Sequence, residues 1–199
     1  MSEADRERWD ARHAVAVDVA PQPPDAVRGR EHLVPTSGRA LDVACGRGAV
    51  AVWLARRGLT VDAVDVSGVA LAAGAALGAG LPIRWCAHDL DTGLPDPGPY
   101  EMIVCQRFRA PALYPQLVAG LAPAGLLAIT VLSEMHDGPG PFRARPGELL
   151  AAFGALDVLV HRERDGEATL VARLGRVPGI LVDEIRDPDR SRHGGGLPS

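Results

Sequence analysis

The chain has 199 residues, 47% of them hydrophobic, and a formal net charge of −4. This length and hydrophobic content suit one α/β domain that buries a substantial core. The acidic balance argues against a nucleic-acid surface or an anionic-membrane surface, which would be basic. The chain contains no lysine, which excludes a pyridoxal Schiff base and a phosphate-binding P-loop lysine.

The amino-terminal part predicts a small helical cap. Its first residues are charged and lack the apolar run of a signal peptide. Residues 3–15 predict an amphipathic helix that carries Trp9, and a proline-rich linker leads to a second short helix near residues 26–33. We interpret residues 1–35 as this N-terminal helical cap.

The rest of the chain alternates between apolar strands and helices. The predicted strands cover about residues 39–44, 60–65, 82–87, 101–106, 125–132, 156–162 and 167–174. The predicted helices cover about residues 48–57, 67–78, 111–121 and 146–153. This alternation predicts parallel strands joined by helices.

The fold predicted for residues 36–174 is therefore α/β: a single Rossmann-like domain with a mostly parallel seven-stranded sheet and helices on both faces. The last two strands are separated only by Arg164-Asp-Gly166, which predicts an antiparallel C-terminal hairpin. Residues 175–199 are rich in Pro, Gly, Asp and Arg and predict a disordered tail. No apolar stretch is long enough to span a membrane. The odd number of cysteines, three, predicts a reducing cytoplasm.

The loop after the first strand is the most informative segment. The strand carries Asp42 near its end, and Gly46 and Gly48 lead into the next helix. The second strand ends on Asp65, and Ser67 opens the helix that follows. Parallel sheets bind ligands at the carboxyl ends of their strands. Because glycine has no Cβ, we expect both glycines to let a ligand approach the backbone.

The two acids indicate the kind of ligand. The spacing Gly46-x-Gly48-x-x-Ala51 also fits a dinucleotide fingerprint, in which a pyrophosphate lies at the helix amino terminus. Asp42 would repel that pyrophosphate. S-adenosylmethionine suits both acids better, because it offers a ribose diol to Asp65 and a sulfonium and an ammonium group to Asp42.

Five segments resemble the motifs of the class I S-adenosylmethionine-dependent methyltransferases. Residues 41–48 resemble motif I, residues 61–67 the ribose motif and residues 84–90 the adenine segment. Residues 100–108 resemble strand 4 of the family, and residues 122–129 resemble the lead into its strand 5. The last has Ala124 where glycine is usual. Residues 7–13 and 145–149 are similar to the TehB-like and thiopurine-methyltransferase-like branch of this family.

The resemblance implies a set of cofactor-binding residues, drawn from the motif loop, the ribose and adenine segments, strand 4 and the amino-terminal helix. They are Asp42, Ala44, Cys45, Gly46, Gly48, Asp65, Val66, Ser67, His88, Asp89, Leu90, Gln106, Trp9 and Arg12. In the family the amino-terminal segment folds over the cofactor, which would bring Arg12 near the methionine carboxylate or an anionic acceptor.

Methyl transfer from a sulfonium depends mainly on proximity and orientation. A base is needed only when the nucleophile arrives protonated, so the catalytic residues stay unknown. Arg107 after strand 4 and His136 in the loop of residues 133–145 are candidates, and that loop is a candidate substrate lid. Arg109, near Arg107, either attracts an anionic acceptor or is a solvated loop charge.

The expected acceptor is a small molecule, either a soft sulfur, selenium or tellurium nucleophile or an anionic metabolite. The thiolates of Cys45, Cys86 and Cys105 could hold a metalloid, although cysteine is also a common small buried residue. The histidines lack metal-ligand spacing, so no metal is predicted. We expect a cytoplasmic monomer or homodimer that binds neither nucleic acid nor membrane. The alternatives are an NAD-dependent oxidoreductase and a non-catalytic SAM-binding regulatory module.

Overall fold

One mixed β-sheet organises the residues that the computed structural model describes, which are 3–17, 19–140 and 142–175. Its strands are β1 (Arg39–Val43), β2 (Thr60–Asp65), β3 (Ile83–Ala87), β4 (Tyr100–Gln106), β5 (Leu121–Ser133), β6 (Arg143–Ala144), β7 (Asp157–Arg164) and β8 (Glu167–Arg173). They lie in the order β3-β2-β1-β4-β5-β8-β7, and β6 pairs with the end of β5. The predicted α/β sheet is confirmed, with β6 as an additional strand of two residues.

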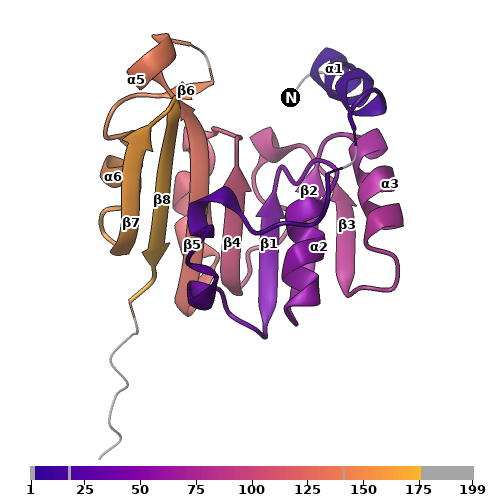
Figure 1. The fold of residues 1–199 in the computed structure, drawn as a ribbon, viewed down its shortest axis with the longest axis horizontal. Helices are drawn as coiled ribbons and strands as arrows, with labels where there is room; N and C mark the ends of the chain where they lie inside the picture. Colours follow the sequence, from indigo (N-terminus) through magenta and orange to yellow (C-terminus); the bar gives the residue numbers. More distant parts are fainter. Residues whose placement is uncertain (1–2, 18, 141, 176–199) are drawn as a thin grey trace, which may run out of the picture.

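The strands β1 to β5 run parallel, so their carboxyl ends share one edge of the sheet, at the top of Figure 1. Strand β8 is antiparallel to both β5 and β7. The turn between β7 and β8 has φ 54° at Asp165 and φ 75° at Gly166. Positive φ at both central residues is what a two-residue hairpin turn requires, so the predicted hairpin is confirmed.

The helices are α1 (Glu3–Ala14), α2 (Ala49–Arg56), α3 (Gly68–Leu77), α4 (Tyr114–Ala119), α5 (Glu134–Asp137) and α6 (Glu148–Phe153). Short 3₁₀ turns cover η1 (Asp25–Val27), η2 (Glu31–Leu33), η3 (Leu90–Thr92) and η4 (Pro111–Leu113). None of the helices in the described residues has the length and apolar character of a membrane span.

Two predicted helices were wrong in detail. Residues 26–33 form two separate turns, η1 and η2, because Gly29 between them takes the left-handed φ of 76°. Residues 111–121 form η4 and then the six-residue α4, which ends before Gly120, and β5 begins at Leu121 rather than near 125.

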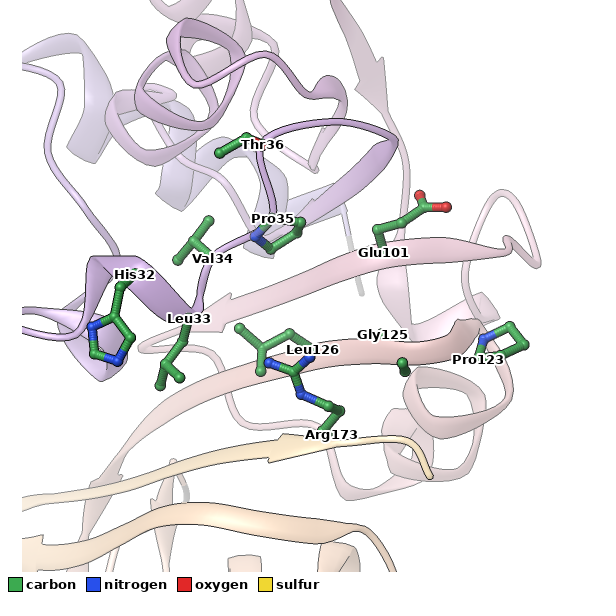
Figure 2. Close-up of a pocket in the computed structure, with 11 residues that line it drawn as sticks. His32, Leu33, Val34, Pro35, Thr36, Glu101, Pro123, Gly125, Leu126 and Arg173 are labelled. Carbon is green, nitrogen blue, oxygen red and sulfur yellow. The ribbon is translucent and has the colours of Figure 1, made fainter. Parts of the chain in front are cut away.

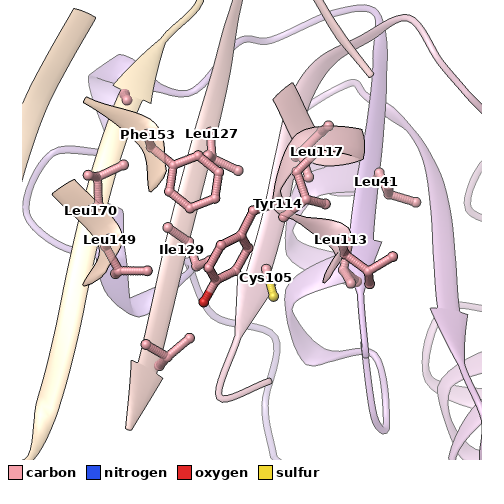
Figure 3. Packing of buried hydrophobic residues seen from close by; sticks show 14 of the residues in the cluster. Leu41, Cys105, Leu113, Tyr114, Leu117, Leu127, Ile129, Leu149, Phe153 and Leu170 are labelled. Carbon is pink, nitrogen blue, oxygen red and sulfur yellow. The ribbon is translucent and has the colours of Figure 1, made fainter. Parts of the chain in front are cut away.

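Alternate residues of the strands enter two cores, one on each face of the sheet. Ala40 of β1 packs into the cluster that holds Leu54 of α2, whereas Leu41 belongs to the opposite cluster. That second cluster packs α4 and α6 on the sheet, and Figure 3 shows Tyr114 and Phe153 lying together, with ring centroids 4.9 Å apart. Burial on both faces is typical of parallel strands and holds their carboxyl ends in a fixed arrangement.

Helix α1 lies above the tips of the strands, next to α3 (Figure 1). It buries none of its residues, so polar contacts hold it. Ser67 Oγ donates to Asp10 Oδ1 at 2.5 Å, and a guanidinium nitrogen of Arg47 donates to the carbonyl of His13 at 2.8 Å. The division into a cap of residues 1–35, a domain of 36–174 and a tail of 175–199 stays a prediction, and residues 176–199 lie outside the described part.

Candidate cofactor and active site

Asp65, at the tip of β2, connects the glycine loop to the start of α3. Its Oδ2 accepts the Gly46 backbone N–H at 2.8 Å, and its Oδ1 accepts the Ser67 backbone N–H at 2.8 Å. The His88 N–H, beyond β3, bonds to the Asp65 carbonyl at 3.0 Å. A carboxylate has about four acceptor sites, so about two stay open for the hydroxyls of a ribose diol.

Asp42, on β1, is a buried acid with an unused oxygen. Its side chain is 2% exposed, and its Oδ2 has no hydrogen-bond partner. Burial raises the pKa of Asp42 to about 7, and the nearby Asp65 charge adds to this, while a hydrogen bond from the Ala51 backbone N–H opposes it. A buried polar atom is normally paired, so this oxygen fits a site that a cationic ligand group completes.

The pKa of Asp42 weakens one step of the sequence argument. A group that titrates near pH 7 is protonated in a large fraction of molecules, and a neutral Asp42 does not repel a pyrophosphate. The choice between S-adenosylmethionine and NAD therefore cannot depend on the charge of Asp42 alone.

The two loop glycines have different roles. Gly46 has φ 54°, and a Cβ there would stand 3.4 Å from Cε1 of His13, an ordinary contact. A Cβ on Gly48 would lie 2.3 Å from the indole of Trp85. Gly48 is therefore required for packing against β3, in addition to its φ of 75°. The expected role of both glycines in ligand approach stays a prediction, and Gly48 in addition makes room for Trp85.

Four other predicted cofactor residues lie beside this loop. Ala44 is half-buried with φ 54°, and Cys45 donates its backbone N–H to the Val64 carbonyl at 2.9 Å. Ser67 is fully buried and caps α3, with half-buried Val66 before it. These contacts hold the loop and the end of β2 as one unit.

The predicted adenine segment folds into η3. Asp89 caps this turn by accepting the Asp91 N–H at 2.9 Å, and His88 Nε2 lies 3.0 Å from the Gly93 carbonyl. Leu90 is 2% exposed and belongs to the core, so its side chain supports the segment from below.

Gln106, the last residue of β4, and Arg107 after it contact η1 and β8. The Gln106 side-chain oxygen accepts the Asp25 N–H at 2.9 Å, which fixes η1. Arg107, with φ 57°, pairs with Glu167 at 3.2 Å and Asp25 at 3.6 Å. These positions do not test the two residues' predicted roles, which stay predictions.

Arg109 is neither a solvated charge nor an open anion site. It makes two hydrogen bonds to the Glu148 carboxylate, at 2.8 and 2.6 Å, and both side chains are largely buried. The Tyr114 hydroxyl donates to the same carboxylate at 3.0 Å. This cluster joins the segment after β4 to α6, and both sequence interpretations of Arg109 are corrected. The backbone of His136 lies in α5, but its side chain lies outside the described part.

On α1, the residue that faces the loop is His13, which sequence reasoning did not single out. The predicted Trp9 and Arg12 contact each other, with the Arg12 guanidinium carbon 5.3 Å from the Trp9 ring centroid. His13 reaches Gly46, as described above, and its Nδ1 is buried without a hydrogen-bond partner. A lone histidine at the end of a polar helix carries no sequence signal for this contact.

The cysteines give little support to a metalloid site. Burial raises the pKa of Cys105 to about 12 and the pKa of Cys45 well above its usual value, so both sulfurs favour the thiol. Among the described residues, no group of three or more His, Cys, Asp or Glu side chains is arranged to hold a metal ion. Thiols are poor metal ligands compared with thiolates.

A hollow of about 380 Å³ lies at the opposite ends of the strands (Figure 2). Its walls come from η2, from the starts of β4 and β5 and from the end of β8, and they include His32, Leu33, Glu101, Leu126 and Arg173. It is therefore separate from the edge that carries Asp42 and Asp65.

Residues 40–125 match a protein family described as "Methyltransferase domain". These residues, less than half of the chain, are thus similar to methyltransferase domains. The match includes the glycine loop, Asp65 and the adenine segment. A search of curated proteins finds no match to the chain.

Solved structures share the fold of this chain. TehB from Haemophilus influenzae superposes with a TM-score of 0.66 at 21% identity, over 75% of this chain and 61% of that one. An S-adenosylmethionine-dependent methyltransferase from Mesorhizobium loti gives 0.62 at 17% identity, over 72% and 94%. The chain thus spans about three-fifths of the TehB structure.

A third structure, the [4+2]-cyclase SpnF, gives a TM-score of 0.62 at 16% identity, over 84% of this chain and 91% of that one. The class I methyltransferase fold is confirmed by these superpositions. The prediction of an enzyme with S-adenosylmethionine as cofactor agrees with the match to methyltransferase domains and with the shared fold. The cyclase also shows that the fold does not determine the reaction.

Proposed function

We propose that this protein transfers the methyl group of S-adenosylmethionine to a small-molecule acceptor. The observation that carries the proposal is the methyltransferase-domain match over residues 40–125. The geometry supports it, because the fold brings Asp65, Gly46 and the unpartnered Asp42 oxygen to one edge of the sheet.

In this proposal Asp65 holds the ribose diol through its open acceptor sites, and Asp42 receives the cationic methionine half. The glycine loop presents its backbone, and His88 to Leu90 frame the adenine. When bound, S-adenosylmethionine supplies a sulfonium that leaves as a thioether when an acceptor lone pair forms the new bond to the methyl carbon. The protein's own work is to bind and orient.

The acceptor enters, in this proposal, at the edge between α1 and α5, which both stand above the strand tips in Figure 1. A soft sulfur, selenium or tellurium nucleophile and an anionic metabolite stay the two proposed classes. Among the described cations, Arg109 is already bound to Glu148. This favours, of the two, the soft nucleophile.

A non-catalytic module that binds S-adenosylmethionine is the second candidate. Its support is that the described residues near the strand tips do not include an identified general base. An oxidoreductase is not retained, because the domain match favours a methyltransferase.

Two measurements test the proposal in sequence. Calorimetric titration with S-adenosylmethionine and with NAD should give a saturable signal for the first and none for the second. A release assay for S-adenosylhomocysteine, run with a panel of thiols, selenite, tellurite and small carboxylic acids, should then identify an acceptor. Binding of NAD alone would contradict the proposal, and binding of S-adenosylmethionine without turnover on any acceptor would favour the regulatory module.

A further inference from the structure

The ligand proposed above contains a group for which the two acids supply no partner. The methionine half of S-adenosylmethionine carries a carboxylate beside its ammonium. Asp65 accepts hydrogen bonds and repels a second carboxylate at short range, and Asp42 is assigned above to the cationic methionine half. The site therefore needs a hydrogen-bond donor near the glycine loop, on the side away from the acids.

His13 is placed to provide this donor. Its imidazole contacts the loop at Gly46, where a Cβ would stand 3.4 Å from Cε1. Its Nδ1 is shielded from solvent and has no partner. A buried nitrogen without a partner is unfavourable, so a ligand oxygen that accepts a hydrogen bond from it would remove that cost.

The position of His13 is fixed by contacts on both sides of the helix end. A guanidinium nitrogen of Arg47 donates to the His13 carbonyl at 2.8 Å, which connects α1 to the loop itself. The Ser67 hydroxyl donates to Asp10 Oδ1 at 2.5 Å, one helical turn earlier. The Trp9 ring stacks on the imidazole, with centroids 6.1 Å apart. The ring is therefore held over the loop before any ligand arrives.

We propose that His13 is a ligand-binding residue that donates a hydrogen bond from Nδ1 to the methionine carboxylate of the cofactor. The inference rests on the proposed function and differs from the sequence expectation, which gave this role to Arg12. Arg12 is exposed and stacks over Trp9, 5.3 Å from the ring centroid, whereas His13 touches the loop.

Two ligands separate this role from a structural one. S-adenosylhomocysteine carries the carboxylate, and 5′-methylthioadenosine has the same nucleoside and thioether but lacks the amino-acid half. Calorimetry should be run on the wild type and on three variants, His13→Leu, His13→Asn and Arg12→Ala. Leucine removes the donor, whereas the asparagine amide keeps an N–H near the position of Nδ1.

The proposal predicts that His13→Leu weakens S-adenosylhomocysteine on the order of ten- to hundredfold, the range for a charge-assisted hydrogen bond. Binding of 5′-methylthioadenosine should stay unchanged, His13→Asn should recover most of the loss, and Arg12→Ala should have little effect on either ligand. This pattern would assign the carboxylate contact to His13, because loss of helix docking alone would weaken the binding of both ligands equally.

Three results would overturn the assignment: an equal loss for both ligands, no loss for either, or the selective loss in Arg12→Ala instead. Failure of the wild type to bind either compound is a different outcome. It would remove the proposed function itself, together with this assignment.

Discussion

Two neighbouring strands, β1 and β2, hold buried aspartates in opposite ways, although Asp62 pairs in register with Leu41, the residue before Asp42. Asp62 of β2 is 5% exposed and accepts from Arg84 at 2.7 Å, from Arg39 at 2.8 Å and from the Tyr100 hydroxyl at 3.1 Å. Asp42 of β1 is equally buried but has one backbone N–H donor and an oxygen with no partner.

The pKa values follow this difference. Burial acts to raise the pKa of Asp62, but the hydrogen bonds from Arg84, Arg39 and Tyr100 outweigh it and lower the pKa. At Asp42, burial dominates and raises the pKa to about 7. Asp62 is already paired with arginine side chains of the protein. Asp42 has no such partner, so its free oxygen is paired only when a ligand supplies a positive group. Strained electrostatics of this kind is typical of functional sites.

The largest expected effect concerns Asp42. Between about pH 4 and 7 the folded protein keeps a proton on Asp42 that the unfolded chain has released. The free energy of unfolding therefore falls as the pH rises through this range and levels off above it. A rise from 3.8 to about 7 corresponds to about 4 kcal/mol. Asp42→Asn should remove this dependence, so its stability relative to wild type should grow from pH 4 to 7.

Urea unfolding at a series of pH values measures this gap. Asp62→Asn is the matched control, because a lowered pKa gives the opposite sign: the stability that Asp62 contributes is lost only as the pH falls below its ordinary range. A gap between Asp42→Asn and wild type that does not change with pH would show that Asp42 is not protonated in the folded protein.

The second effect concerns the compensated acid. Asp62→Ala removes the acceptor of the Tyr100 hydroxyl and one of two acceptors of Arg39 and Arg84, which also pair with Asp96. Arg39 and Arg84 are 38% and 55% exposed, so the loss should be smaller than for a fully buried pair, about 2 kcal/mol. Urea unfolding at pH 7 checks it, and a loss below about 0.5 kcal/mol would reduce the cluster to an ordinary surface ion pair.

The smallest global effect is expected at α1. Asp10→Ala removes the acceptor for the Ser67 hydroxyl and the Val69 N–H. Because α1 buries none of its residues, the urea midpoint should not move. Hydrogen exchange in residues 3–14 should become faster, as measured by mass spectrometry. Unchanged exchange in α1 would mean that Asp10 does not hold the helix over the site.

Much of the fold was predictable because its signals are local. Apolar runs, the Arg164-Asp-Gly166 turn and the glycine loop each indicate an element from a few adjacent residues. The short β6 was not predictable, because two residues show no periodicity. The break between η1 and η2 depends on the backbone angle of Gly29, which the sequence permits but does not require.

The site was predictable only in part. Asp42, Gly46 and Asp65 follow from the motif, but its spacing does not report that Asp42 lacks a cation. Arg109 looked like a loop charge because its partner, Glu148, is distant in the sequence. His13 of α1 lies against the glycine loop, and Gly48 of that loop packs against Trp85 of β3. Both contacts join segments that are distant in the sequence, so no local pattern predicts them.

The central claim is that Asp65, at the tip of β2, binds the cofactor, whereas Asp62, three residues earlier on the same strand, only stabilises the fold. Calorimetric titration of S-adenosylmethionine into wild type, Asp65→Ala and Asp62→Asn tests it on two acids of the same strand. Asp65→Ala should weaken binding on the order of ten- to hundredfold, because its hydrogen bonds to the ribose are charge-assisted. Asp62→Asn should stay within about twofold. Unchanged affinity in Asp65→Ala, or an equal loss in both variants, would contradict the account.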